Sequence, residues 1–403
     1  MNAIALNGWL GANRFLVVFA LLASLMGTSV GVAKITTALY AIALGANAEQ
    51  LGLLVAGQVA GTLVMSIPIG FLVDHYGPRR LFVLGSVLAG LTYVLIPVVG
   101  TPAFLLGCTT AIGFFMPLRF VSLNTIFFEQ IRRMGAGKAG WYRATHLAGQ
   151  FLIGPGIAVA LIHALGYAGT WWILAASFAL TIAVSPMVLS SYARPAAAGT
   201  VVLPSPGRVG RDLLALLRDR TLREICLIDI AIESVFTYQT TFVVAIALQV
   251  FHVGEAGASA FVTGTGLSFI ATLLLTGGLT ARLGARTSYR IGFFLATAGL
   301  LFLGSAAGPG WMWPGIVVLG IGLGLVQTVT LSRAAEIGGR LGQGKVSGLI
   351  LMTFPIGGIL GGLAGGWAGE RLGLQAVYIL FVPVFLALLA AQWRRADGLN
   401  TTQ

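Results

Sequence analysis

Apolar segments long enough to cross a membrane follow one another along almost the whole chain. Each has about the 20 residues that a helix needs to span the bilayer core, or more. Only 9% of the residues are charged and 57% are apolar, so lipid rather than water must face much of the surface. The sequence predicts an all-α membrane protein with twelve transmembrane helices, near residues 14–44, 48–73, 80–99, 102–129, 139–165, 168–190, 222–251, 256–281, 288–306, 311–337, 345–369 and 374–393.

The basic residues indicate which side of the membrane each turn faces. All but three of the 24 Lys and Arg residues fall at the chain ends, in every second turn or in the central connection. The positive-inside rule then places both termini and that connection in the cytoplasm, and we expect a bacterial-type cytoplasmic (inner) membrane. No basic patch is interleaved with aromatic residues, which argues against nucleic acid as a partner.

The chain reads as two similar halves joined by a linker. We expect six-helix bundles at 1–190 and 222–403, and a cytoplasmic linker at 191–221 whose residues 211–220 suit either a basic amphipathic helix or a plain loop. A shift of 207 residues pairs Gly77 with Gly284 and Gly166 with Gly373, and it also pairs charged residues at the inner turns. Six helices separate the copies, so both have the same orientation, as in parallel transporter repeats.

The turn at residues 70–80 reads GFLVDHYGPRR and resembles the signature loop of the major facilitator superfamily. His75 and Pro78 depart from the family pattern, and Ala281 replaces the aspartate in the second copy. The segment from Gly149 to Gly156 resembles part of the family's antiporter motif, without its final glycines. The resemblance covers the whole chain. It implies two pseudo-symmetric six-helix bundles around a central cavity and transport by alternating access.

Glycines recur every four residues in the helix expected at 345–369, in two rows at 357, 361, 365, 369 and at 358, 362, 366. Small residues at this spacing let neighbouring helices approach closely, so we expect both rows to be packing surfaces.

Four ionisable residues fall inside predicted membrane helices: Lys34, Arg119, Asp229 and Glu233. Such residues are costly in lipid and usually face a cavity or a partner. We hypothesise that Lys34 and Arg119 hold an anionic group while Glu233 or Asp229 takes up a proton, since burial favours the protonated carboxyl. The alternatives are a structural ion pair between Glu233 and Arg119, and a Lys34 that reaches the outer surface.

Two residue sets complete the predicted site. The substrate-binding set shares helical faces with the ionisable residues and comprises Lys34, Arg119, Glu233, Gln327, His146, Thr28 and Thr237. The gating set lies at the inner turns and comprises Asp74, Gly77, Arg79, Arg80, Glu129, Arg133, Glu336 and Arg340. For the first four of these the role is what the resemblance implies. For the last four we expect the ion pairs Glu129 with Arg133 and Glu336 with Arg340.

These features favour a secondary transporter of a small organic anion or zwitterion, coupled to protons and acting as a monomer. The alternative is an efflux pump for amphipathic drugs or a metal chelator, and a third is a membrane sensor that transports nothing. An enzyme is not expected, because the four histidines are scattered and Cys108 and Cys226 lack metal-ligand spacing. No phosphate-binding loop is complete, so we expect neither ATP nor any cofactor.

Overall fold

The computed structural model describes residues 14–134, 145–189 and 215–397, and within these ranges the regular structure is helical throughout. Contacts divide the chain into two compact units, Met1–Thr37 with Val64–Leu203, and Ala38–Leu63 with Pro204–Gln403. The boundary between Leu63 and Val64 falls inside the helix α3, which contributes to both units. The first half of α3 packs against α15, a helix near the C-terminal end of the chain.

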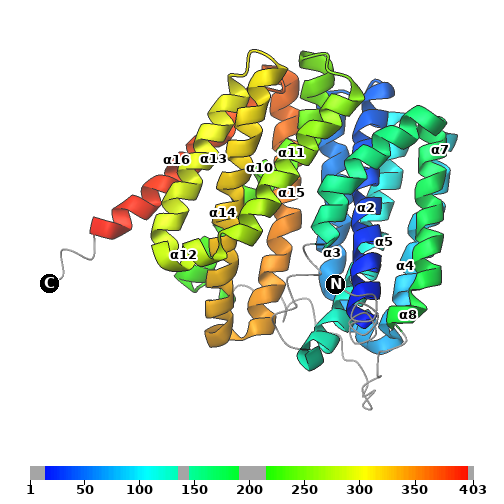
Figure 1. The fold of residues 1–403 in the computed structure, drawn as a ribbon, viewed down its shortest axis with the longest axis horizontal. Helices are drawn as coiled ribbons and strands as arrows, with labels where there is room; N and C mark the ends of the chain where they lie inside the picture. The colour runs from blue at the N-terminus through cyan, green and yellow to red at the C-terminus, as the bar shows by residue number, and fades with distance from the viewer. Residues whose placement is uncertain (1–13, 135–144, 190–214, 398–403) are drawn as a thin grey trace, which may run out of the picture. The chain divides into compact units, whose positions relative to one another are not determined.

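The first unit is built from the blue to green helices of Figure 1. In chain order the elements are α2 (Arg14–Ala43) as far as Thr37, α3 (Ala48–Tyr76) from Val64 onward, α4 (Pro78–Leu95), a 3-10 turn η1 (Ile96–Val98), α5 (Pro102–Met134), a π-helical turn η3 (Gly149–Ile153), α7 (Gly154–Val184) and α8 (Pro186–Leu189). Buried Phe19, Leu22 and Met26 of α2 pack with Phe82 of α4 and Leu123 of α5 in one hydrophobic cluster.

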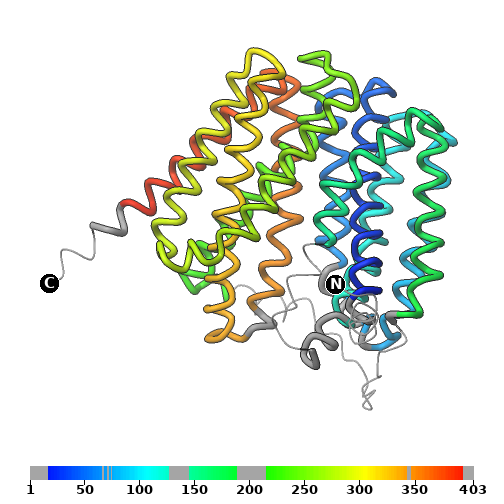
Figure 2. The backbone as a smooth tube through the Cα atoms, viewed as in Figure 1, coloured from blue at the N-terminus to red at the C-terminus, as the bar shows by residue number. Residues whose placement is uncertain are grey.

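The second unit continues from green to red, and Figure 2 follows the same path along the chain. Besides the end of α2 and the first half of α3, within Ala38–Leu63, its elements are α10 (Arg220–Ala245), a π-helical turn η4 (Ile246–Val250), α11 (Glu255–Leu275), α12 (Gly277–Leu283), α13 (Ala285–Gly304), α14 (Pro309–Leu341), α15 (Gln343–Leu372) and α16 (Ala376–Asp397). Leu222 and Ile225 of α10 pack with Ile337 of α14 and Leu349 of α15 in its cluster of buried residues.

Eleven helices of the described ranges are long and apolar enough to cross a membrane, and one of them counts twice. The stretch Thr145–Val184 has 40 residues, which at about 1.5 Å per residue is roughly twice the thickness of the bilayer core. Gly166 breaks it with a φ of 68° and a ψ of −179°, so the stretch is two helices joined at a sharp bend. The twelve-helix prediction is confirmed.

The backbone preserves the internal repeat. Gly77 and Gly284 begin α4 and α13 with φ values of 85° and 76°, and Gly166 and Gly373 have φ values of 68° and 89°. With ψ near 150–180° this conformation is essentially restricted to glycine. Matched pairs 207 residues apart therefore make the same turns, and the expectation of two pseudo-symmetric halves is confirmed.

Most helix ends differ from the predicted ones by a few residues. The α5 helix, for example, runs to Met134 rather than to residue 129, and α14 spans Pro309–Leu341 rather than 311–337. Two of the differences have a clear physical cause. The third helix was expected from residue 80, but α4 begins at Pro78, because proline is well suited to the first position of a helix and needs no hydrogen-bond partner there. The helix expected at 256–281 is instead α11 followed by the short α12, with the break at Thr276 before the Gly277–Gly278 pair.

Candidate functional site

The predicted substrate residues of the first half gather where α2 crosses η3 and the start of α7. A Cβ atom on Gly154 would lie 2.7 Å from the Cα of Gly31, and one on Gly149 would lie 2.7 Å from the backbone nitrogen of Thr28. Backbone therefore contacts backbone at this joint, which explains why both positions are glycine. The partial antiporter motif is thus a packing motif in this structure.

Lys34 and His146 flank this joint. Lys34 is half-buried, and its Nζ lies 5.9 Å from the centre of the Phe151 ring, in the π-helical turn. The Nδ1 of His146 lies 3.3 Å from the carbonyl oxygen of Ala23, and its ring meets Phe120 edge-on at 5.3 Å. Thr28 is half-buried between them. The first unit thus brings together three of the predicted substrate residues, Thr28, Lys34 and His146.

Arg119 takes a different position. Its side chain is 0% exposed, and its guanidinium stacks 3.9 Å from the centre of the Phe178 ring on α7. One nitrogen donates to the hydroxyl of Thr181 at 2.9 Å, while Nε has no hydrogen-bond partner among the described residues. In this conformation the side chain points into the core between α4, α5 and α7, and its contact with an anion stays a prediction.

The predicted proton-coupling residues lie on α10, facing α15. Asp229 is 3% exposed, and the hydroxyl of Thr353 on α15 donates to its Oδ2. Thr353 Oγ1 also lies 2.5 Å from the carbonyl oxygen of Ile350. Glu233, one helical turn away, is half-buried. Its Cβ packs against Gly357 of α15, so closely that a Cβ added to Gly357 would lie only 2.6 Å from it. Asp229 is therefore the more enclosed carboxyl and Glu233 the more accessible one.

Further polar groups line the interior of the second unit. Gln327 on α14 is 3% exposed, and its Oε1 has no hydrogen-bond partner among the described residues. Since burying an unpaired amide oxygen costs free energy, this atom is a candidate contact for water or a ligand. Thr237 is half-buried on α10, next to the α15 face that carries Gly358.

The two glycine rows of α15 pack against two different helices, as the sequence predicted that they would be packing surfaces. Gly357, Gly361 and Gly365 contact Glu233, Ser234 and Tyr238 of α10. The second row faces the first half of α3: a Cβ on Gly362 would lie 3.0 Å from the carbonyl oxygen of Gly52, and one on Gly366 would lie 3.0 Å from the Cα of Gly52. We call this second contact the α3–α15 seam.

Charges close one end of the α3–α15 seam. Arg371 Nη1 lies 2.8 Å from Glu49 Oε1 and 3.0 Å from the carbonyl oxygen of Trp367. The neighbouring Glu370 accepts a hydrogen bond from the backbone N–H of Ala48 at 2.9 Å, which caps the start of α3. Sequence reasoning missed this pair, because Glu49 and Arg371 are 322 residues apart and neither lies in a recognised motif.

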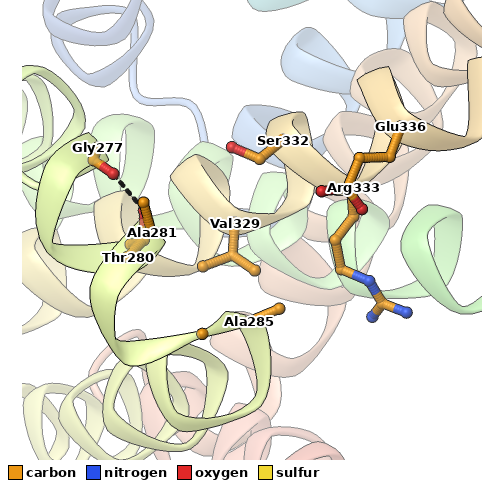
Figure 3. A pocket seen from close by; sticks show the side chains of 9 residues that line it. Gly277, Thr280, Ala281, Ala285, Val329, Ser332, Arg333 and Glu336 are labelled. Carbon is orange, nitrogen blue, oxygen red and sulfur yellow. Dashed lines mark hydrogen bonds between the residues drawn. The ribbon is translucent and has the colours of Figure 1, made fainter.

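One of the two predicted gating residues of the second half, Glu336, lines a cavity at the turn between α12 and α13. Figure 3 shows small residues, Thr280, Ala281 and Ala285, facing Val329, Ser332, Arg333 and Glu336 of α14. The cavity has a volume of about 270 Å³. Ala281 occupies the position that pairs with Asp74 in the repeat, so the missing carboxylate leaves space here.

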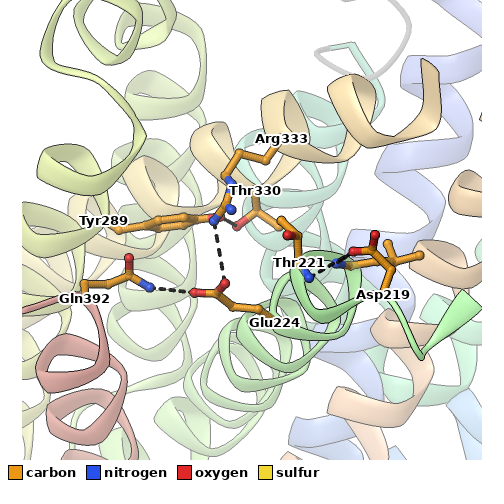
Figure 4. A network of polar contacts seen from close by, with 8 residues as sticks. Asp219, Thr221, Glu224, Tyr289, Thr330, Arg333 and Gln392 are labelled. Carbon is orange, nitrogen blue, oxygen red and sulfur yellow. Dashed lines mark hydrogen bonds and ion pairs between the residues drawn. The ribbon is translucent and has the colours of Figure 1, made fainter. Parts of the chain in front are cut away.

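The expected Glu336–Arg340 ion pair is not what the described contacts show. Arg340 Nη2 lies 3.7 Å from Asp219, which caps α10 by accepting from the backbone N–H groups of Thr221 and Leu222 at 2.9 Å. Figure 4 shows Asp219 beside a second group, in which Glu224 lies 4.0 Å from Arg333 and accepts from Gln392 at 2.8 Å. Arg340 thus ties α14 to α10 rather than to its own helix.

Of the remaining predicted gating residues, three are described by the structure and three have side chains that are not. Gly77 makes the turn already given, and Arg79 and Arg80 are exposed in the first turn of α4. The side chains of Asp74, Glu129 and Arg133 lie outside the part of the structure that is described. No group of three or more His, Cys, Asp or Glu residues in the described ranges is placed to hold a metal ion.

Known proteins with similar sequence or structure are membrane transporters. Residues 16–247 and 230–400 match a family model described as Major Facilitator Superfamily. A stretch of 157 residues is 31% identical to the multidrug efflux pump Tap of Mycolicibacterium fortuitum, covering 34% of this chain and 37% of that protein. The chain therefore spans little more than a third of this curated relative.

Solved structures match over nearly the whole chain. A mutant of the nucleoside transporter NupG aligns with a TM-score of 0.78 at 15% identity, covering 94% of this chain and 99% of NupG. A bacterial homologue of the human lysosomal transporter Spinster aligns with a TM-score of 0.76 at 14% identity, covering 95% and 97% of the two chains. At these identities the likeness concerns the fold.

Proposed function

Because this chain belongs to the major facilitator superfamily, we propose that it is a proton-coupled secondary transporter of a small organic anion or zwitterion. Transport in such a protein is a cycle of alternating access, driven here by a proton gradient rather than by ATP. The proposal places the chain in a bacterial-type cytoplasmic membrane with both termini inside, as the distribution of Lys and Arg favours.

The observation that carries the coupling proposal is the enclosed carboxyl of Asp229. Asp229 is 3% exposed within a membrane-spanning helix and accepts a hydrogen bond from Thr353, and carboxyl groups enclosed in such helices commonly serve in proton relays. Thr353 has one hydroxyl proton and two acceptors within reach, Asp229 and the carbonyl of Ile350. When Asp229 is ionised the hydroxyl turns to the carboxylate, and when Asp229 carries a proton the hydroxyl is free to turn to Ile350.

The cationic side of the proposed site is Lys34. Its ammonium group lies beside the joint between α2 and the π-helical turn, and such turns occur frequently at functional sites. We propose Lys34 as the contact for the substrate's negative charge, with Thr28, His146, Glu233, Thr237 and Gln327 completing the set. Arg119 enters this set only in a conformation that moves it out of the Phe178 stack.

The test uses the purified full-length protein in liposomes that contain a pH-sensitive dye. A panel of small carboxylates and amino acids is added outside at equal and at unequal pH. At least one compound is expected to move protons together with its own uptake, and Asp229→Asn is expected to remove the proton movement. Full coupling in both Asp229→Asn and Glu233→Gln, or uptake of every transported compound without protons, would refute the coupling proposal.

A second candidate function is the efflux of amphipathic drugs. The stretch that is 31% identical to the multidrug efflux pump Tap favours it, although that stretch covers only part of each chain. Lipophilic cations and small organic anions are compared for thermal stabilisation of the purified protein. Stabilisation by many unrelated lipophilic cations, with none by the anions, would replace the first proposal with this one.

A further inference from the structure

The first turn of α4 carries two arginines at the end of an apolar groove. We call this surface the α4 groove; it is shallow and open, has a volume of about 560 Å³, and is lined by Arg79, Arg80, Val83, Leu84 and Val87, all from α4. They belong to the candidate membrane span Pro78–Val98, and all except the half-buried Val83 are exposed. Exposed apolar side chains such as Leu84 and Val87 on a membrane-spanning helix suit contact with lipid, so we infer that this face meets the bilayer.

The two arginines have no counter-charge among the side chains that the structure describes. Among the described residues neither makes an ion pair or a hydrogen bond, whereas Arg333, Arg340 and Arg371 each have a carboxylate partner. The first turn of α4 also contains no acidic residue. Positive charge in the first turn of a helix is unfavourable, so these arginines do not serve the helix that carries them. An anion from outside the chain would supply a counter-charge that no described side chain supplies.

The order of the lining residues along α4 indicates what kind of anion fits. Arg80, Val83, Leu84 and Val87 follow one another at the spacing of a single helix face. Positive charge therefore lies at one end of a narrow apolar strip that runs along the membrane span. A soluble phosphate would contact only the arginines and leave the apolar strip uncovered. A phospholipid with an anionic headgroup would contact the arginines with its headgroup and the strip with an acyl chain.

The second copy of the repeat keeps only one of the two arginines at the same place, because Arg286 pairs with Arg79. The 207-residue shift pairs Arg80 with Thr287, Val83 with Arg290 and Val87 with Phe294. Arg290 donates to the backbone oxygen of Gln392 at 2.9 Å and stacks on Trp393, so its charge is already engaged. Phe294 is 63% exposed and adds a ring where Val87 leaves room.

We propose that the α4 groove is a binding site for an anionic phospholipid, with the headgroup phosphate at Arg79 and Arg80 and one acyl chain along Val83, Leu84 and Val87. Basic residues at a membrane surface attract anionic lipid, and the apolar strip adds contacts with the acyl chain. The site assigns to the signature turn a lipid partner in addition to its proposed gating role.

The test measures lipid retention by the purified full-length protein in a neutral detergent. Native mass spectrometry counts bound phosphatidylglycerol and phosphatidylcholine across a titration of each lipid. Wild type is expected to retain phosphatidylglycerol in preference to phosphatidylcholine. The double variant Arg79→Gln, Arg80→Gln is expected to bind phosphatidylglycerol about tenfold more weakly, since each basic residue near the surface contributes to the attraction. Arg286→Gln, which pairs with Arg79 in the repeat, is the charge control.

Val87→Phe tests the apolar part of the site, because it copies the second half of the repeat and leaves every charge in place. It is expected to weaken phosphatidylglycerol binding without abolishing the preference over phosphatidylcholine. Equal lipid retention by the double variant and by Arg286→Gln would overturn the proposal. Displacement of the lipid by millimolar inorganic phosphate, with no effect of Val87→Phe, would replace it with a soluble-anion site. Neither measurement requires transport, so the lipid site and the transport proposal fail independently.

Discussion

Adding one methyl group at Gly52 should separate α3 from α15. A Cβ at this position would lie 3.0 Å from the Cα of Gly366 and closer still to the carbonyl group of Gly362. Both are backbone atoms, so no side chain can move aside to relieve the contact. The helices themselves must shift. Gly52→Ala therefore destabilises the conformation in which the seam is closed, relative to any conformation in which the two helices are apart.

The size of the effect follows from a comparison of two substitutions. Overpacking a tight contact costs about 1–3 kcal/mol. Replacing glycine by alanine inside a helix by itself stabilises by about 0.5–1 kcal/mol. Gly348 also lies in α15, but nothing lies within 4 Å of a Cβ placed there, so Gly348→Ala gives the intrinsic gain alone. The difference between the two variants isolates the contact. At about 1.4 kcal/mol for each factor of ten, the closed seam loses roughly five- to a hundredfold in population.

The assay is pulsed electron–electron spin resonance between labels at Leu53 and Leu360, which are exposed positions on α3 and α15. The only native cysteines are Cys108 and Cys226, both buried, so a cysteine-free background needs only two changes. Gly52→Ala is expected to move the distance distribution to longer values, and Gly348→Ala to leave it unchanged. Identical distributions in wild type and Gly52→Ala, with equal thermal stability in the two alanine variants, would refute the close contact.

Three further outcomes are expected. Glu49→Gln should lower the free energy of unfolding by less than about 1 kcal/mol, because both side chains of its ion pair with Arg371 are about half exposed, and high salt should abolish the difference. Thr353→Val should destabilise by about 1–3 kcal/mol and change the pH profile of uptake, whereas Thr353→Ser, which keeps the hydroxyl, should do neither. Arg119→Lys should destabilise more than Arg119→Met in thermal unfolding, because lysine keeps the buried charge but loses the flat stack on Phe178; the reverse order would contradict the aromatic environment.

The sequence predicted the helices and their repetition well because both depend on local composition. The length of the apolar segments, the glycines at the turns between them and the 207-residue shift can all be read from the sequence. Gly166 and Gly373 bend the chain as their pairing implies. Several boundaries moved by a few residues, and proline or a glycine pair explains the changes at Pro78 and at Gly277–Gly278.

The environment of the candidate site was much less predictable. The rise per residue gives the depth of Arg119 along its helix, but not the direction in which the side chain points, and that direction depends on neighbours far away in sequence. Thr181 and Phe178, the contacts of Arg119, come from another helix. Thr353 escaped notice because membrane threonines commonly bond to their own helix, and its second contact with Asp229 spans 124 residues. The α15 glycine rows were predicted as packing surfaces, but only the structure shows which helix each row meets.

The α3–α15 seam is made largely of main chain, and this has a consequence for repeated motion. Interlocking side chains must find their rotamers again each time two surfaces rejoin, and ordering long side chains costs entropy. Where Gly52 meets Gly362 and Gly366 there is no rotamer to choose. Such a surface can separate and close again many times in the same register. Because no side chains must be reordered there, closure does not pass through mispacked intermediates.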